Sequence, residues 1–172
     1  MKLHLACGKR RLSGFVHIDA REMEGVNHVT DIADLVMFEA NEAELIYVCH
    51  ALEHFPRPQV LDILKEWRRV LQPGGTLRLS VSDFSVLADL YVNHGVSLLR
   101  LRGPLMGRQD YLMNTHYTVW DYELLSWTLG EAGYYNIQRW DPYETHPVGY
   151  DDYSFAKVNS RLISLNVEAT AS

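Results

Sequence analysis

Three residues that close apolar segments of the chain have the chemistry to hold a nucleoside. Gly8, Asp19 and Asp31 each stand at or just after the end of such a segment. A glycine lets the backbone approach a ligand closely, because it has no Cβ. A carboxylate only accepts hydrogen bonds, so Asp19 suits the two hydroxyls of a ribose and Asp31 suits an amino group such as that of adenine. Ile32 adds an apolar neighbour for the ring.

A second group of residues has the chemistry to move a proton. His50, Glu53 and His54 follow the apolar segment that ends at Cys49, and His116 lies in a later polar stretch. Histidine titrates near neutral pH and is the natural general base for a hydroxyl or a protonated amine. We rank His50, His54 and His116, in this order, as candidate catalytic residues, with Glu53 to orient a ring. Structural or surface roles are the alternative for each of them.

The same residues, His50, Glu53 and His54, also spell H-x-x-E-H, a zinc signature of inverted metallopeptidases. That chemistry needs the motif inside a helix. Here an apolar run of strand length precedes the motif, Pro56 and Pro58 follow it, and no later carboxylate stands out as a third ligand. A zinc-dependent hydrolase is therefore a remote alternative, and we expect no metal site.

The elements that must position these residues are short apolar runs with turn residues at their ends. Such runs are typical of strands, and runs with little polar alternation suggest strands covered on both faces. An amphipathic pattern begins at Pro58 and ends before Pro73-Gly74-Gly75, which we expect to end the helix and turn the chain. Ser82 or Asp83 can cap a second helix, and Asp121 can cap a third. We expect strands at 2–6, 15–19, 26–32, 45–49, 76–81, 135–140 and 161–168, and helices at 58–71 and 84–93. A third helix follows the Asp121 cap and ends at Gly130 or Gly133.

This order of elements predicts an α/β fold, an open sheet of seven mostly parallel strands with helices on both faces. In such sheets ligands bind at the carboxyl ends of the strands, where the candidate residues stand.

Composition limits the function classes. The 172 residues are 47% apolar and 22% charged, which suits one globular domain. The net charge of −6 argues against duplex nucleic acid as a partner. No apolar run has the length of a membrane span and the start lacks a secretory signal, so we expect a cytoplasmic protein without a membrane partner. Cys7 and Cys49 are expected to be reduced and buried.

Four segments, taken in order, resemble the motifs of class I S-adenosylmethionine-dependent methyltransferases. They read LHLACG at 3–8, GFVHID at 14–19, HALEHF at 50–55 and RVLQPGG at 69–75. The likeness is greatest to a small, mostly uncharacterised bacterial group whose members read L-x-L-G-C-G and H-x-L-E-H-F. The resemblance implies a Rossmann-like methyltransferase fold with S-adenosyl-L-methionine as cofactor.

Carried over position by position, the resemblance assigns the cofactor's methionine part to the turn of Ala6, Cys7 and Gly8. It assigns the ribose to Asp19, with Ala20 beside it, and the adenine edge to Asp31 and Ile32. Cys49 and His50 would lie near the sulfonium and its methyl group.

Two departures from the pattern stand out. Ala6 replaces the usual first glycine of the turn, and only eleven positions separate Gly8 from Asp19, too few for a full helix after the first strand. The basic triplet of Lys9, Arg10 and Arg11 could meet the cofactor's carboxylate, or could be a solvated surface.

The resemblance divides the domain, residues 1–172, into a cofactor-binding half (1–83) and a substrate-facing half (84–172). Nine of the ten tyrosines lie beyond residue 90, and tyrosine suits sugars and aromatic ligands. We expect a small-molecule or glycan acceptor, with oxygen or nitrogen undecided, and a homodimer is an option. The fourth-strand motif is not the Asp/Asn-Pro-Pro-aromatic signature of enzymes that methylate nucleic-acid bases. A non-catalytic cofactor-binding or partner subunit is the main alternative.

Overall fold

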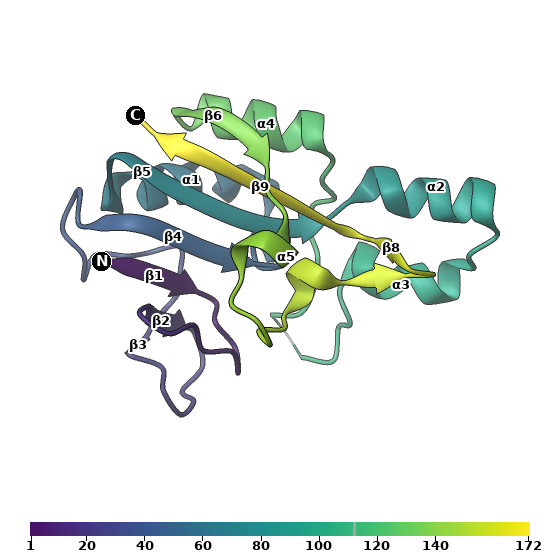
Figure 1. Ribbon diagram of the computed structural model, residues 1–172, viewed down its shortest axis with the longest axis horizontal. Coiled ribbons are helices and arrows are strands. Elements are labelled where there is room, and N and C mark those ends of the chain that lie inside the picture. Colours follow the sequence, from purple (N-terminus) through teal and green to yellow (C-terminus); the bar gives the residue numbers. More distant parts are fainter. Residues whose placement is uncertain (112) are drawn as a thin grey trace.

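In the computed structural model, which describes residues 1–111 and 113–172, seven strands form one sheet in the order β3-β2-β1-β4-β5-β9-β6 (Figure 1). The strands β1 to β5 run parallel, and β9 lies antiparallel between β5 and β6. The predicted seven-stranded, mostly parallel sheet is confirmed. The strands are β1 (Lys2–Leu5), β2 (Val16–Asp19), β3 (His28–Val29), β4 (Ala43–Cys49), β5 (Leu71–Ser82), β6 (Tyr134–Arg139) and β9 (Ser164–Ala171).

Two long helices, α1 (Arg57–Val70) and α4 (Tyr122–Glu131), cover one face of the sheet, where they lie behind it in Figure 1. The bounds of α1 differ from the predicted ones by one residue, and α4 ends between its two predicted ends, Gly130 and Gly133. Val60, Ile63, Leu64 and Trp67 of α1 are buried in the main apolar core, together with leucines of α4 and of the central strands. Since apolar residues recur on one side of each helix, burial against the sheet determines which side faces inward.

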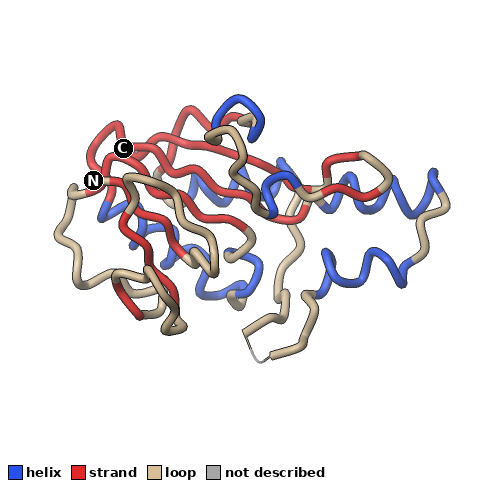
Figure 2. The backbone as a smooth tube through the Cα atoms, turned by 60° about the horizontal axis from the view of Figure 1, so that its bottom comes forward, coloured by secondary structure: helices blue, strands red, loops and turns tan. Residues whose placement is uncertain are grey.

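The other face of the sheet is covered by short elements. The connections after β1 and β2 contain no helix, as Figure 2 shows by the tan loops that join these strands. The chain 140–156 lies over this face instead, with α5 (Pro142–Thr145) and the 3₁₀ turn η2 (Tyr153–Phe155). The helix on this face is therefore only four residues long.

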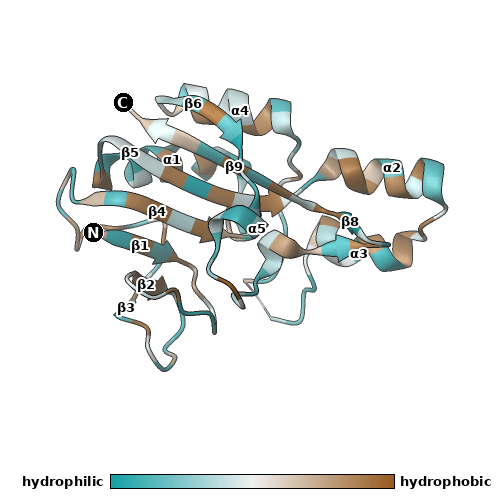
Figure 3. Ribbon diagram, viewed as in Figure 1, coloured by the Kyte–Doolittle hydropathy of each residue, from teal (hydrophilic) through white to brown (hydrophobic). Residues whose placement is uncertain are grey.

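The strands themselves alternate, which the sequence reading of continuous apolar runs missed. Leu3, Ile46 and Leu79 face the helices, whereas His4, Tyr47 and Arg78 stand at neighbouring positions on the opposite side. Figure 3 shows hydrophobic and hydrophilic residues following one another along β5. The second face is thus polar and aromatic, and buries groups that need hydrogen-bond partners.

The Pro73-Gly74-Gly75 segment does not end the helix, contrary to our expectation. The helix α1 stops at Val70 and β5 starts at once with Leu71, which pairs with Ala43 before the register shifts. The glycines form an irregularity inside the strand: Gly74 has φ of +80°, and a Cβ on Gly75 would lie 2.8 Å from the carbonyl oxygen of Gln72. Glycine is required there by conformation and by space.

Beyond β5 the chain forms an arm that projects from the sheet (Figures 1 and 2). Asp83 caps its first helix, α2 (Phe84–His94), as predicted, by accepting hydrogen bonds from the backbone of Ser85 and Val86. The helix α3 (Leu98–Met106) and the ribbon of β7 (Lys157–Val158) and β8 (Arg161–Leu162) were not foreseen. Because β8 pairs with β7, the last sheet strand starts at Ser164, three residues later than expected. None of the described helices has the length and apolarity needed to cross a membrane.

Candidate active site

The carboxyl ends of β1 and β2 bring Gly8 and Asp19 together. The Gly8 backbone N–H donates to Oδ2 of Asp19 at 2.8 Å, and the Cys7 N–H donates to the Ile18 carbonyl at 3.1 Å. Asp19 is only 4% exposed. The parallel register of the two strands sets this contact, because it aligns Leu5, the last residue of β1, with Ile18, which lies one residue before the end of β2.

The turn itself is a left-handed stretch of backbone. Ala6 has φ of +49° and Gly8 has φ of +55°. Glycine adopts this conformation at little cost, whereas an alanine is strained in it. Ala6 thus has the backbone shape expected of the glycine that it replaces.

Arg21 is a site residue that the sequence reading missed. Its backbone N–H and its Nε both donate to Oδ1 of Asp19, at 3.0 and 3.1 Å. Its guanidinium lies over the Tyr111 ring, with Cζ 5.5 Å from the ring centroid, and is the nearest group to the open side of Gly8. The pKa of Arg21 is raised by the hydrogen bond that its side chain donates to the Asp19 carboxylate. A basic residue two positions after the acid was the available signal.

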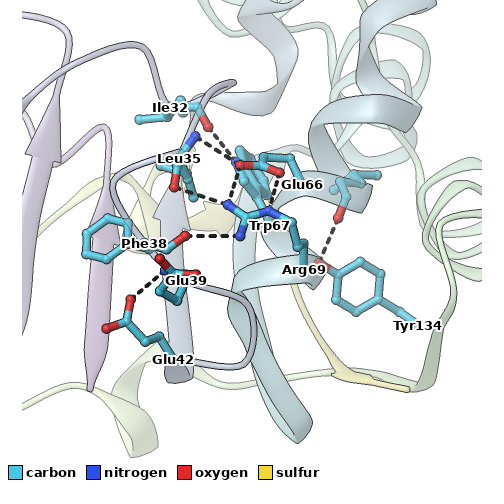
Figure 4. A network of polar contacts seen from close by, with 10 residues as sticks. Ile32, Leu35, Phe38, Glu39, Glu42, Glu66, Trp67, Arg69 and Tyr134 are labelled. Carbon is cyan, nitrogen blue, oxygen red and sulfur yellow. Dashed lines mark hydrogen bonds and ion pairs between the residues drawn. The ribbon is translucent and has the colours of Figure 1, made fainter.

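Asp31 and Ile32 lie in the loop between β3 and β4. Side chains of α1 contact the backbone of this loop at Ile32, Leu35 and Phe38 (Figure 4). Trp67 Nε1 donates to the Ile32 carbonyl at 2.7 Å, and Arg69 donates to the carbonyls of Leu35 and Phe38. Asp31 is exposed and accepts from the Ala33 N–H at 2.9 Å through one oxygen. The Ile32 side chain is buried in the main core, so only its backbone and edge are left for a ligand.

The basic triplet is largely engaged within the protein. Arg11 donates to the Gly8 carbonyl at 2.9 Å and also to the Glu24 carbonyl, which ties the turn to the β2–β3 loop. Arg10 pairs with Asp151 at 3.3 Å, and Lys9 is exposed. The Arg11 side chain therefore stabilises the turn by hydrogen bonds to its backbone and to the β2–β3 loop.

At the end of β4, His50 has a strained backbone and two engaged ring nitrogens. Its φ is +49°, and its N–H donates to the Ser80 carbonyl at 2.8 Å. Nδ1 lies 3.1 Å from Oε1 of Glu53, and Nε2 lies 3.0 Å from Oγ of Ser164. Non-glycine residues in this region of φ are costly and gather at functional sites. Ala20 is exposed at the end of β2, and the half-buried Cys49 lies before His50, with the pKa of its thiol raised by burial.

His54 and His116 lie side by side, with ring centroids 4.7 Å apart. Nδ1 of His54 lies 3.1 Å from the Thr115 carbonyl oxygen, and Nδ1 of His116 lies 3.1 Å from the Pro104 carbonyl oxygen. A carbonyl only accepts, so each Nδ1 donates its proton to the carbonyl, and Nε2 is the ring nitrogen left to face other partners. Burial lowers the pKa of His116, against the raising effect of the Glu53 carboxylate.

Glu53 is buried beside the His50 ring and lies near His116. It is 1% exposed, and its backbone carbonyl accepts from the Tyr117 N–H at 2.8 Å. Burial raises the pKa of the Glu53 carboxyl, but the contact with His50 and the nearby His116 outweigh it, so the pKa is lowered and the group is a carboxylate. The structure thus brings together all four residues of the predicted proton-transfer group.

The zinc alternative loses its geometric basis. The residues between His50 and His54 form only the three-residue 3₁₀ turn η1 (Leu52–His54), and His50 lies before it in a left-handed conformation. The two histidines therefore do not stand one turn apart on an α-helix. Across residues 1–111 and 113–172, no three His, Cys, Asp or Glu side chains are grouped to hold a metal ion.

The turn and its acids suit a bound nucleoside with a charged tail. A Cβ at Gly8 would meet no atom nearer than Nη2 of Arg21 at 3.8 Å, and Arg21 is an exposed, flexible side chain. One oxygen of Asp31 is free of described hydrogen bonds and faces solvent. The backbone at Gly8 is therefore open on the side that faces the Arg21 guanidinium.

Comparison with known proteins gives one family match. Residues 11–79 match the family model described as "Methyltransferase domain". A search of curated proteins finds no significant match.

Solved structures resemble the chain over almost its whole length. A possible exported protein from Bordetella parapertussis superposes with a TM-score of 0.62 at 14% identity, over 98% of this chain and 61% of that one. A SAM-dependent methyltransferase from Archaeoglobus fulgidus gives 0.59 at 13% identity, over 98% and 85%. The Burkholderia thailandensis 1,6-didemethyltoxoflavin-N1-methyltransferase gives 0.62 at 13% identity, over 99% and 70%.

These likenesses show the fold. The strand order with its antiparallel β9 is that of class I methyltransferases, as the sequence resemblance implied. The chain spans less than two thirds of the length of the Bordetella protein.

Proposed function

We propose that this chain, which carries an S-adenosylmethionine-dependent methyltransferase domain, moves the methyl group to an oxygen or nitrogen atom of a small-molecule or glycan-type acceptor. The observation that carries the proposal is the meeting, at one end of the sheet, of two kinds of group. One is the Gly8–Asp19 cradle, and the other is a pair of histidines with free Nε2 atoms.

The cofactor-binding role falls to residues 1–83. Asp19 would receive the ribose hydroxyls, Asp31 the adenine amino group, and the turn of Ala6 to Gly8 the methionine part. Arg21, which now covers the cradle, is well placed to meet a carboxylate by a charge-assisted hydrogen bond. S-adenosylmethionine supplies an activated methyl group on a sulfonium, so no protein nucleophile is needed.

The chain's own contribution to chemistry is orientation and proton transfer. Holding an acceptor in line with the methyl group removes much of the entropic barrier. The acceptor's proton would go to Nε2 of His116 or His54, because both rings are held in the tautomer that leaves this nitrogen free. This reverses the order expected from the sequence, in which His50 came first.

Acceptor selection falls to residues 84–172. Tyr111, Tyr117 and Tyr153 are exposed around the candidate site, on segments that pack near Arg21, Glu53 and His50. Exposed tyrosines provide stacking surfaces and hydroxyl donors for a sugar or an aromatic ring. Leu112, which belongs to this half of the chain, lies outside the described residues.

The test is an assay for S-adenosylhomocysteine, the co-product, with pooled metabolite extracts as the source of acceptors. The wild-type protein should release it, whereas Asp19→Ala should not, because the variant loses the ribose contact. Cofactor binding without co-product in any fraction would favour the alternative of a non-catalytic cofactor-binding subunit. Absence of cofactor binding would refute both.

A further inference from the structure

We propose that the arm formed by α2, α3 and the β7–β8 ribbon binds a lipid surface with anionic headgroups, by inserting its apolar tip among the lipids. The tip is the end where α2 leads into α3 through the turn at residues 95–97. Figures 1 and 2 show it as the part of the arm farthest from the central sheet. The binding needs neither cofactor nor acceptor, and only its consequence for the acceptor rests on the proposed function.

The tip exposes four large apolar side chains within nine positions of the chain. Tyr91 and Val92, in the last turn of α2, are 55% and 73% exposed. Leu98 and Leu99, in the first turn of α3, are 56% and 70% exposed. Single exposed apolar residues are ordinary on protein surfaces, whereas a group of them at one place marks a surface that binds a partner or a membrane.

The arm has an apolar core of its own, to which the tip does not belong. Leu87 and Leu90 of α2 pack in this core with Leu101 of α3 and with Ile163, and each of the four is at most 5% exposed. The helices are therefore held together by other residues than those at the tip. Substitutions at the tip should leave the arm folded.

The charge of the arm favours an anionic partner. The whole chain has a net charge of −6, yet residues 84–106 and 157–162 together hold four Lys or Arg side chains and one acidic one. Arg100 and Arg102, which follow the tip along α3, are both exposed. Cations at the edge of an apolar surface attract the headgroups of anionic lipids.

The acidic side chain of the arm is neutralised within the arm. Asp89 pairs with Arg161 of the ribbon, and its Oδ2 lies 3.3 Å from Nε2 of His94. By contrast, Nη1 of Arg100 donates to a neutral atom, Oδ1 of Asn159, at 3.0 Å. The positive charge beside the tip is thus left to attract an outside partner.

The shape of the tip favours a lipid surface over a protein. A helical hairpin that projects from the molecule presents its end as a convex surface (Figure 2). Apolar side chains bury at the boundary between headgroups and acyl chains without a matching hollow. The Tyr91 ring, with its polar hydroxyl, suits the same boundary. Binding of this kind needs no spanning segment, which was the basis for expecting no membrane partner from the sequence.

The inner end of the arm lies at the candidate site. The His116 N–H donates to the Met106 carbonyl at 3.0 Å, and Nδ1 of His116 lies 3.1 Å from the Pro104 carbonyl oxygen. The nine residues of α3 span about 13 Å between the tip and this contact. On the proposed function, a sugar that is linked to a lipid and extends this far from the bilayer would reach His116.

The test is flotation of the ligand-free, full-length protein with two kinds of vesicle. One kind contains phosphatidylcholine mixed with phosphatidylglycerol, and the other contains phosphatidylcholine alone. The wild type should bind the anionic vesicles far more strongly, and added salt should weaken this binding, because counter-ions screen the arginines. Binding to neither kind of vesicle, or equally to both, would overturn the proposal, and neither result would bear on methyl transfer.

Variants at the tip show whether this surface does the binding. Leu98→Ser combined with Leu99→Ser should lower the partition coefficient at least about 10-fold, because the inserted apolar area is lost. Arg102→Glu reverses a charge and should lower it about 30-fold. The matched controls, Leu124→Ser on α4 and Lys65→Glu on α1, change exposed residues outside the arm and should bind like the wild type. Unchanged binding of either tip variant would contradict insertion of the tip.

A second copy of the chain is the competing occupant of the tip. Light scattering of the wild-type protein without vesicles measures self-association, and we expect a tip that is free of a second copy. A dimer that Leu98→Ser combined with Leu99→Ser dissociates would assign the tip to self-association and overturn the proposal.

Discussion

The two faces of the central sheet bury different kinds of side chain. On the helix side, leucine, isoleucine and valine side chains pack against α1 and α4 in one apolar core. On the other side, His4, Tyr47 and Asp152 are buried in a layer of aromatic and hydrogen-bonded groups. The first face is held by apolar area, and the second combines ring contacts with hydrogen bonds such as that of Tyr47 to Asp152. Some buried polar atoms on the second face, such as His4 Nδ1 and Ser80 Oγ, have no described hydrogen-bond partner.

The difference shows which face orients the side chains of the candidate site. The chain of contacts from Glu53 through His50, Ser164 and Asn166 lies on the polar side and leads on to the buried Ser154. Directional bonds fix protons and rotamers in a way that apolar packing does not. The helix side supplies stability, and the polar side supplies orientation to the site.

The largest effect expected is on the helix side, at Trp67. This residue is fully buried in the main core, so Trp67→Ala should lower the free energy of unfolding by about 3–5 kcal/mol. Urea denaturation measures the loss. The control is Trp127→Ala on α4, where the side chain is 64% exposed. A loss at Trp67 no greater than at Trp127 would contradict the picture of an apolar core on this face.

A smaller loss is expected on the polar side, at Tyr47. Its hydroxyl donates to Oδ2 of Asp152 at 2.5 Å and lies 3.2 Å from Nε2 of His146. Tyr47→Phe keeps the ring but leaves Asp152 one donor short, which should cost about 1–3 kcal/mol. Tyr143→Phe, at an exposed ring on α5, is the control and should change little. If Tyr47→Phe were as stable as wild type, directional bonds would not hold this face.

The polar face should also make stability sensitive to pH. Burial, with the nearby His17, lowers the pKa of His4 to about 3 from 6.5. Between these values the unfolded chain binds a proton that the folded protein does not, so His4 stabilises the fold above pH 6.5 and this stability is lost as the pH falls. One such group contributes a slope of about 1.4 kcal/mol per pH unit.

Urea denaturation at pH 7.0, 6.0 and 5.5 measures this slope, in a range above the usual titration of carboxylates. His4→Phe should flatten it, whereas His94→Asn, at an exposed histidine of α2, should not. His17, His116 and His146 also have pKa values lowered by burial, so part of the slope should persist in His4→Phe. Equal slopes in His4→Phe and wild type would show that His4 is not buried in its neutral form.

The smallest effect is expected at Ala6, where the sheet passes into the cofactor turn. An alanine with φ of +49° is strained, and glycine relieves that strain at some entropic cost. Ala6→Gly should therefore raise stability by about 0.5–1 kcal/mol, seen as a higher melting temperature. A clear destabilisation would mean that the Ala6 methyl group packs usefully at this turn.

The fold was more predictable than the site, for a physical reason. The helix over 58–71 was readable because apolar residues recur on one side of it, and its observed bounds differ by one residue. The turn at Gly8 and the acid at Asp19 could be paired because they end adjacent strands. The polar face was missed, since His4, His17 and Tyr47 stand singly between apolar residues and look like interruptions of buried runs.

The proton arrangement of the site lay beyond sequence reasoning. The carbonyl that accepts from His54 belongs to Thr115, 61 positions away along the chain. The carbonyl that accepts from His116 belongs to Pro104, 12 positions away. Ser164 and Asn166 lie two positions apart within the strand predicted over 161–168, but the sequence analysis did not identify them as site residues. Their meaning depends on His50 lying opposite, more than a hundred positions away.

The most direct measurement of the central claim is calorimetric titration of the wild-type protein and Asp19→Ala with S-adenosylmethionine, with melting curves to show that both are folded. The wild type should bind the cofactor with heat release, and Asp19→Ala should bind about 10- to 100-fold more weakly, because hydrogen bonds to a carboxylate contribute about 1.5–3 kcal/mol. Equal affinity of folded Asp19→Ala and wild type, or no binding by either, would contradict the account.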